Sequence, residues 1–139
     1  MVFFFDACLS PRIARMIAAF DTAHRIRHIY DEDAFNRDDP DTTIIGRLSQ
    51  ENPRPCLVTS DIGIMRRGGQ ERTLLKDSGL ACIFFKKGFS ELKLEEQAWK
   101  TVRIWPKLAM VVASCRQPTA FEIGPNARKV ELYRLTRDL

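Results

Sequence analysis

The stretch that decides the fold is MVFFFDACLSPR, residues 1–12. Its apolar run, residues 2–5, lacks the polar alternation of a half-buried strand and is typical of a strand buried on both faces of a sheet. Asp6 ends the run at once. A helix start follows at Ser10-Pro11, because serine caps helices and proline suits the first helical position. The stretch therefore predicts a buried strand, an aspartate at its end and a helix after it.

The rest of the chain repeats this alternation of strand and helix patterns. Further strands are expected at residues 24–30, 56–59, 80–85, 121–123 and 129–135, and helices at residues 11–20, 70–76, 92–104 and 105–115. Another helix is expected where Asp39-Pro40 gives a cap followed by proline, with an apolar face that includes Ile44 and Leu48. This order predicts an α/β fold with a mostly parallel sheet and right-handed crossovers.

Length and composition limit the class of protein. The 139 residues fit one domain, which we take to be residues 1–139, and 45% hydrophobic with 29% charged residues is typical of a globular protein. No apolar stretch approaches the roughly 18 residues of a membrane span, and the apolar start is too short for a signal peptide. We therefore expect a cytoplasmic protein. The four cysteines form no CxxC pair, so we expect reduced, buried thiols.

The net charge of +4 is unevenly distributed. Residues 31–41 hold six acidic residues and one basic residue, which leaves 21 basic and 12 acidic residues in the rest of the chain. A basic body with one acidic segment suits a polyanionic partner and a local cation site. Charge alone favours the simpler interpretation, a solvated acidic loop on an ordinary basic protein.

Three aspartates are expected at one edge of the sheet. In open α/β sheets, ligands bind beyond the carboxyl ends of the strands. Asp6 directly follows the first strand, and Asp61 follows the strand at residues 56–59 by two residues. Asp41 lies in the first turn of a helix, where the helix dipole favours a carboxylate. Structural roles stay open for all three, as a cap, a turn residue and a first-turn acid, and Asp39 competes with Asp41.

Carboxylates at separate strand ends suit a hard divalent cation. Mg²⁺ and Mn²⁺ prefer oxygen ligands, and they keep waters and substrate phosphates beside one or a few carboxylates. Such an ion polarises a phosphate oxygen and lowers the pKa of a bound water. The pattern therefore favours metal-dependent cleavage of a phosphodiester by Asp6, Asp41 and Asp61.

The ordered motifs resemble those of a known family. The run Phe5-Asp6-Ala7-Cys8-Leu9-Ser10-Pro11-Arg12, with the apolar residues before it, resembles the opening of PIN-like ribonucleases, including VapC-type toxins. The stretches Asp41-Thr42-Thr43-Ile44 and Val58-Thr59-Ser60-Asp61 resemble the second and third motifs of that family, and Trp105-Pro106 a later one. The resemblance covers roughly residues 2–106.

This resemblance implies a three-layer α/β/α fold and RNA cleavage that depends on Mg²⁺ or Mn²⁺. It implies that Asp6, Asp41 and Asp61 bind the metal, with Asp39, Thr59 and Ser60 as accessory candidates. It also implies a toxin of a type II toxin–antitoxin pair, neutralised by a cognate antitoxin protein, and a homodimer. Relatives often carry Asn or Glu where Ala7 and Cys8 stand here, and we assign no fourth acid.

Basic residues are expected to line the same edge and hold an RNA backbone. The candidates for RNA binding are Arg12, Arg66 and Arg67, and the rim also includes Arg15, Arg72, Lys76, Lys86 and Lys87. An alternative is a catalytically inactive PIN-like module that binds RNA or a protein.

Two other enzyme classes each fail on one residue. A low-molecular-weight phosphatase with Cys8 as nucleophile needs Arg six residues later, where Ala14 stands. A haloacid-dehalogenase-like enzyme with Asp6 as nucleophile needs a second Asp two residues later, where Cys8 stands.

Overall fold

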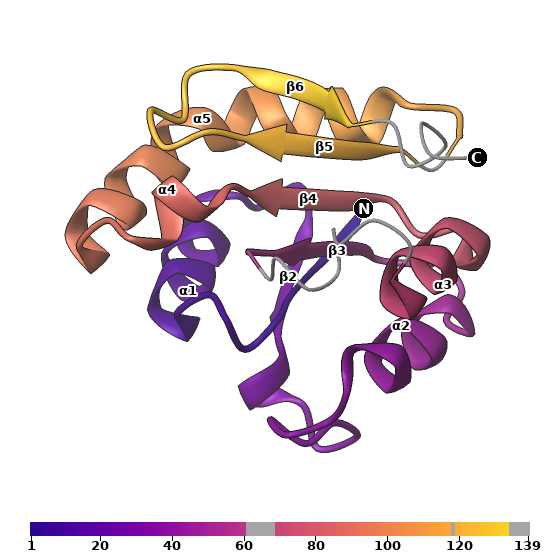
Figure 1. Ribbon diagram of the computed structural model, residues 1–139. Coiled ribbons are helices and arrows are strands. Elements are labelled where there is room, and N and C mark those ends of the chain that lie inside the picture. Colours follow the sequence, from indigo (N-terminus) through magenta and orange to yellow (C-terminus); the bar gives the residue numbers. More distant parts are fainter. Residues whose placement is uncertain (61–68, 118, 134–139) are drawn as a thin grey trace.

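A computed structural model describes residues 1–60, 69–117 and 119–133. In these ranges, helices and strands alternate along the chain (Figure 1). The strands are β1 Val2–Phe5, β2 Arg25–His28, β3 Cys56–Thr59, β4 Cys82–Phe85, β5 Ala120–Ile123 and β6 Val130–Tyr133. The helices are α1 Pro11–Phe20, the 3₁₀ helix η1 Ile29–Asp31, α2 Asp41–Ser49, α3 Gln70–Ser78, α4 Lys87–Ser90 and α5 Leu94–Ser114.

The strands form one sheet in the order β2-β1-β3-β4-β5-β6. All neighbouring pairs are parallel except β5 and β6, which are antiparallel. The carboxyl ends of the five parallel strands therefore lie at one edge of the sheet, which we call the carboxyl edge. The expected mostly parallel sheet is confirmed.

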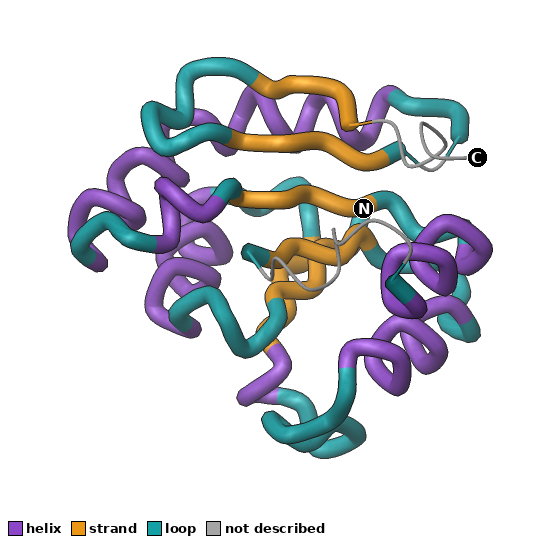
Figure 2. The backbone as a smooth tube through the Cα atoms, in the orientation of Figure 1, coloured by secondary structure: helices purple, strands orange, loops and turns teal. Residues whose placement is uncertain are grey.

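Helices cover both faces of the sheet (Figure 2). On one face, α1 and α5 pack together and bury apolar residues that include Ile17 and Leu108. On the other face, α2 and α3 pack together over a second core that includes Ile45 and Leu75. Two separate cores with the sheet between them make a three-layer α/β/α fold, as expected.

Strand β1 contributes to both cores. Phe3 and Phe5 point into the core beneath α1 and α5, and Phe4 points into the core beneath α2 and α3. Side chains alternate between the faces of a strand, so a strand with helices on both sides needs apolar residues at every position. This explains why the sequence has an uninterrupted run of phenylalanines.

The first helix begins as the sequence predicted. Ser10 is the N-cap of α1 and accepts a hydrogen bond from Arg12 N at 3.2 Å, and Pro11 is the first helical residue. Near the end of the chain, residues 124–129 connect β5 to the antiparallel β6, between the two strands that the sequence predicted there. These elements depend on local residue chemistry, which the sequence carries in full.

Two helix boundaries differ from the sequence prediction. Helix α2 has Pro40 as its N-cap with no side-chain cap, so Asp39 does not cap it. Asp39 instead accepts a hydrogen bond from Asn36 N at 2.8 Å within the acidic loop. Helix α5 is one continuous helix with Pro106 inside, where we expected two pieces. Burial of residues on both sides of the proline, Trp105 and Leu108 among them, offsets its lost hydrogen bond.

Two of the four cysteines are not buried as expected. Cys56 and Cys82 lie in the strands and are buried, whereas Cys8 and Cys115 are exposed in the segments after β1 and α5. All four are free thiols. In the described part of the chain, no helix is both long enough and apolar enough to cross a membrane.

Trp105 joins α5 to β1 and to the end of α1. Its side chain is 1% exposed and contacts the rings of Phe3 and Phe5, with centroid distances of 4.8 and 5.7 Å. Its indole Nε1 donates a hydrogen bond to Asp21 Oδ2 at 2.7 Å. One side chain therefore stabilises the packing of both helices on this face.

We predict that Trp105→Ala lowers the free energy of unfolding by about 3–5 kcal/mol, because it leaves a large cavity in the core. Trp105→Phe keeps most of the ring and loses the N–H donor, so it should cost less than half as much. Urea unfolding followed by circular dichroism measures both. If both variants lost the same free energy of unfolding, packing of the Trp105 ring would not be the main contribution.

His28 is buried at the end of β2. Its Nε2 lies 2.7 Å from Leu9 O, and its Nδ1 accepts a hydrogen bond from Tyr30 N, which begins η1 after β2. Burial lowers the pKa of His28 below 6.5, although the contact with Leu9 O opposes this shift. The folded protein therefore holds His28 neutral at neutral pH.

A lowered histidine pKa makes the unfolded state bind the proton first as the pH falls. We predict that the stability contributed by neutral His28 is fully present above about pH 6.5 and is lost as the pH drops below it. His28→Gln should show a smaller loss between about pH 7 and pH 5, measured by urea unfolding. Burial raises the pKa of Asp21, but hydrogen bonds from Trp105 and His24 outweigh it and lower that pKa below 3.8. Asp21 therefore affects stability only at more acidic pH than His28 does. If the unsubstituted protein and His28→Gln lost the same stability between about pH 7 and pH 5, this role of His28 would be contradicted.

Candidate active site

Asp6 lies directly after β1 at the carboxyl edge. Its backbone N–H continues the sheet by donating to Val58 O at 3.1 Å, so the residue is placed by the pairing of β1 with β3. The residue is only 5% exposed. A buried carboxylate needs hydrogen-bond or charge partners, because its desolvation costs free energy.

The neighbours of the Asp6 carboxylate come from two strand ends. Oδ1 accepts hydrogen bonds from the backbone N–H of Cys8 at 2.9 Å and from its thiol at 2.5 Å. Oδ2 accepts a hydrogen bond from the Thr59 hydroxyl at 2.6 Å. Thr59 is the last residue of β3, so the pairing of β1 with β3 brings the two side chains together. Both carboxylate oxygens are thereby held in a fixed orientation.

Cys8 is exposed as a residue, but its sulfur is turned inward toward Asp6. It lies 3.3 Å from Thr59 Oγ1 and accepts a hydrogen bond from Ser60 N at 3.1 Å. Burial of the sulfur, the negative charge of Asp6 and the hydrogen bond to Asp6 together raise the pKa of the thiol to about 12. Cys8 is therefore a neutral hydrogen-bond donor to Asp6, and this argues against a role as nucleophile.

Thr59 and Ser60, expected as accessory residues, both lie at this position. Thr59 is fully buried and Ser60 nearly so. Thr59 orients the Asp6 carboxylate, and the backbone of Ser60 orients the Cys8 sulfur. Asp61, the next residue, lies outside the described residues, as do Arg66 and Arg67.

Asp41 lies in the first turn of α2, as the sequence predicted, and is the first residue of that helix. Helix α2 leads into the amino end of β3, so its own amino end lies toward the carboxyl edge. Asp39 precedes the N-cap Pro40; its carboxylate accepts a hydrogen bond from Asn36 N in the acidic loop and lies 3.5 Å from Arg47 Nη1 of α2. Asp41 is therefore the acid within the helix, and Asp39 is an acid of the loop before it.

The possible metal-ligand atoms at Asp6 are of the type that a hard cation prefers. They are the oxygens of a carboxylate and a hydroxyl, which Mg²⁺ and Mn²⁺ prefer, with the neutral Cys8 thiol beside them. Within the described residues, no three His, Cys, Asp or Glu side chains come together as a metal-binding group. A site that includes Asp61 extends beyond the residues described.

Much of the expected basic rim is engaged elsewhere. Arg72 is buried at 6% exposure and donates a hydrogen bond to the Tyr133 hydroxyl, so it supports β6. Arg15 is ion-paired with Asp31, Lys86 with Glu122 and Lys87 with Glu91. Arg12 is exposed in the first turn of α1. Arg72 is therefore not an exposed residue of the rim.

The fold and the acid after β1 define an α/β protein with a carboxylate site at the carboxyl edge of its sheet. A family model described as a PIN-like domain matches residues 1–87. The chain therefore belongs to the PIN-like domain family. The match includes Asp6, Asp41 and Asp61, and this membership suggests a nuclease-type function in general. No curated protein and no solved structure gives a match.

The sequence did not indicate that Cys8 is a partner of Asp6. We had expected a buried structural thiol at this position. A short side chain often accepts hydrogen bonds from groups two residues further along, and the spacing of Asp6 and Cys8 allows this local turn. The distance of the sulfur from Thr59 and Ser60 depends on strand pairing, so no local pattern could have shown it.

We predict slow alkylation of Cys8 in the folded protein, because a pKa of about 12 leaves little thiolate at neutral pH. Its reaction with iodoacetamide, followed by peptide mass spectrometry, should still be accelerating with pH above about pH 9. The control is the protein unfolded in guanidinium chloride, in which Cys8 should react much faster. Asp6→Asn should speed the reaction, since it removes the nearby negative charge. Equal rates in folded and unfolded protein would contradict this.

Proposed function

We propose that this protein is a metal-dependent endoribonuclease in which Asp6, Asp41 and Asp61 bind Mg²⁺ or Mn²⁺. The observation that supports it most is the buried Asp6 carboxylate at the carboxyl edge, within the residues that match the PIN-like family. When bound, the ion supplies positive charge to the phosphodiester and makes water a better nucleophile.

Residues around Asp6 have defined parts in this proposal. Thr59 and the backbone of Cys8 hold the carboxylate in one orientation, so that it does not have to be ordered when the substrate binds. Asp41 adds a second negative charge from the start of α2. Arg12, Arg66 and Arg67 bind the RNA backbone.

On the resemblance of its motifs to VapC-type toxins, the proposal extends to a cellular role. The protein is the toxin of a type II pair in the cytoplasm, where a cognate antitoxin protein neutralises it and where it forms a homodimer. Co-expression with the product of a small neighbouring gene would test this role, because the antitoxin should relieve growth arrest and co-purify. Growth arrest that persists with Asp6→Asn would contradict it.

We predict that the purified protein degrades RNA in the presence of Mn²⁺, and that Asp6→Asn and Asp61→Asn lower the rate by at least about 100-fold. Thr59→Val should cost about 10- to 100-fold, which is typical of groups that orient a metal ligand. Release of a fluorophore from a labelled RNA measures the rate, and circular dichroism checks the fold. EDTA should abolish the activity of the unsubstituted protein.

Asp77→Asn is the matched control, since Asp77 is exposed near the end of α3, toward the opposite edge. Its activity should equal that of the unsubstituted protein. Cleavage that persists in both Asp6→Asn and Asp61→Asn, or that resists EDTA, would contradict the proposal.

A second candidate function is a PIN-like module that binds RNA or protein without cleavage. It is favoured by Ala7 and Cys8 standing where relatives often carry Asn or Glu, and by the hydrogen bonds from Cys8 to Asp6. Absence of both cleavage and Mn²⁺ binding, the latter measured by calorimetry, would support this candidate instead.

A further inference from the structure

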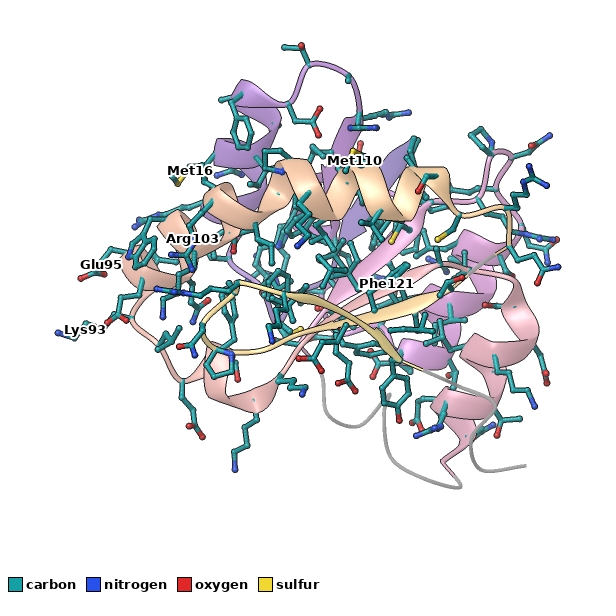
Figure 3. All side chains as sticks on the ribbon, turned by 90° about the horizontal axis from the view of Figure 1, so that it is seen from above. Met16, Lys93, Glu95, Arg103, Met110 and Phe121 are labelled. Carbon is teal, nitrogen blue, oxygen red and sulfur yellow. The ribbon has the colours of Figure 1, made fainter. Side chains whose placement is uncertain are left out.

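A group of basic residues gathers around an exposed tryptophan on α5. Trp99 is 50% exposed, with Arg103 Cζ 4.9 Å and Lys100 Nζ 5.5 Å from its ring centroid. Trp99, Arg103 and Lys107 are four residues apart, so they form a stripe of about 12 Å along one side of the helix. Figure 3 shows Arg103 between Glu95 at one end of α5 and Met110 toward the other.

The β5–β6 connection adds to this stripe. Arg103 Nη2 donates hydrogen bonds to the backbone oxygens of Asn126 and Ala127, and Lys100 Nζ donates one to Pro125 O. Beside these contacts is a hollow of about 440 Å³, lined by Arg103, Ile104, Lys107, Ala127 and Arg128. We call Trp99, Lys100, Arg103, Lys107 and Arg128 the α5 basic patch.

Within the described residues, the cations of the α5 basic patch lack the carboxylate partners that Arg15 and Arg27 have. Among the described residues, none of its cations forms an ion pair, whereas Arg27 pairs with both Glu32 and Glu51. Glu95 and Glu96 in the first turn of α5 limit the patch at one end, where the helix dipole favours them. Several positive charges around a hollow suit a ligand with several negative charges.

The α5 basic patch lies near the edge at which Asp6 is found. The β5–β6 connection leaves the carboxyl end of β5, and Asp6 leaves the carboxyl end of β1. Strands β3 and β4 separate them in the sheet, which corresponds to about 14 Å at the usual strand spacing. A short length of nucleic acid chain can therefore contact both.

We propose that the α5 basic patch is a second binding surface for single-stranded RNA, separate from the aspartate site. An unpaired base stacks on Trp99, while Lys107 and Arg128 contact the phosphates on either side of the hollow. Single-stranded RNA fits better than a duplex because stacking on Trp99 requires an unpaired base. The patch lies outside the residues that match the PIN-like family.

The choice of RNA as the polyanion rests on the proposed function, and a membrane surface is the alternative to be tested. Membrane-surface helices bury a broad apolar face in the lipid beside their basic residues. Here, the apolar residues that line the hollow between Lys107 and Arg128 are Ile104 and Ala127, and both are buried, so they offer no broad apolar face. This geometry favours a phosphate chain over a lipid surface.

The test measures RNA binding without cleavage. The Asp6→Asn protein is titrated into a fluorescein-labelled polyuridine oligonucleotide in EDTA at several KCl concentrations, and anisotropy gives the affinity. We expect Lys107→Gln/Arg128→Gln to weaken binding at least about tenfold. The slope of log affinity against log salt should become shallower by about 1.4, or about 0.7 for each lost phosphate contact. Trp99→Ala should weaken binding about tenfold with little change in slope.

The matched control is Arg25→Gln/Arg116→Gln, which removes two exposed positive charges at the opposite edge of the sheet. It should bind within about twofold of the parent, since it changes net charge equally without touching the patch. Equal weakening by both pairs would overturn the proposal, as would unchanged binding by Lys107→Gln/Arg128→Gln. Loss of binding to phosphatidylglycerol vesicles in that variant, with RNA binding retained, would also overturn it.

This test is independent of catalysis. If the unsubstituted protein cleaves no RNA but binding depends on Lys107 and Arg128, the proposed function fails and the second surface stands. If the protein cleaves RNA while Lys107→Gln/Arg128→Gln binds as the parent does, the second surface fails and the proposed function stands.

Discussion

Burial of β1 on both faces is the constraint on which the rest of the structure depends. Phe3 and Phe5 anchor the core beneath α1 and α5, and Phe4 anchors the core beneath α2 and α3. A strand between two helical layers has its backbone paired on both sides, here by β2 and β3. The residue that follows β1 is therefore held at a fixed place, and that residue is Asp6.

The same constraint explains the chemistry around Asp6. A carboxylate at the end of a buried strand is partly desolvated, so the protein must supply donors, and it does so from Cys8 and Thr59. These donors orient the carboxylate and limit its freedom to rearrange. Preorganisation of this kind suits metal binding, and it is equally the feature that a binding module without catalysis would keep.

The basic residues on the surface fall into two groups, those with a carboxylate partner and those without one among the described residues. Arg15, Lys86 and Lys87 each have a carboxylate partner, so they contribute little net field at the carboxyl edge. The cations near Trp99 have no such partner among the described residues and surround a hollow. The apolar side of the long helix α5 thus covers one core, and another side of the same helix carries positive charge. Helix α5 therefore links the packing of the fold to the binding of a polyanion.

Local chemistry in the sequence determined the strand at residues 2–5, the Ser10 cap, the alternation of strands and helices, and the positions of Asp6 and Asp41 at the starts of turns and helices. Only the tertiary structure decided the contact of Asp6 with Cys8 and Thr59, the continuity of α5 through Pro106, the burial of His28 and the pairing of Arg72 with Tyr133. The physical reason is distance along the chain. Capping and periodicity act over a few residues, whereas burial and side-chain partners arise from strands and helices that meet only after folding.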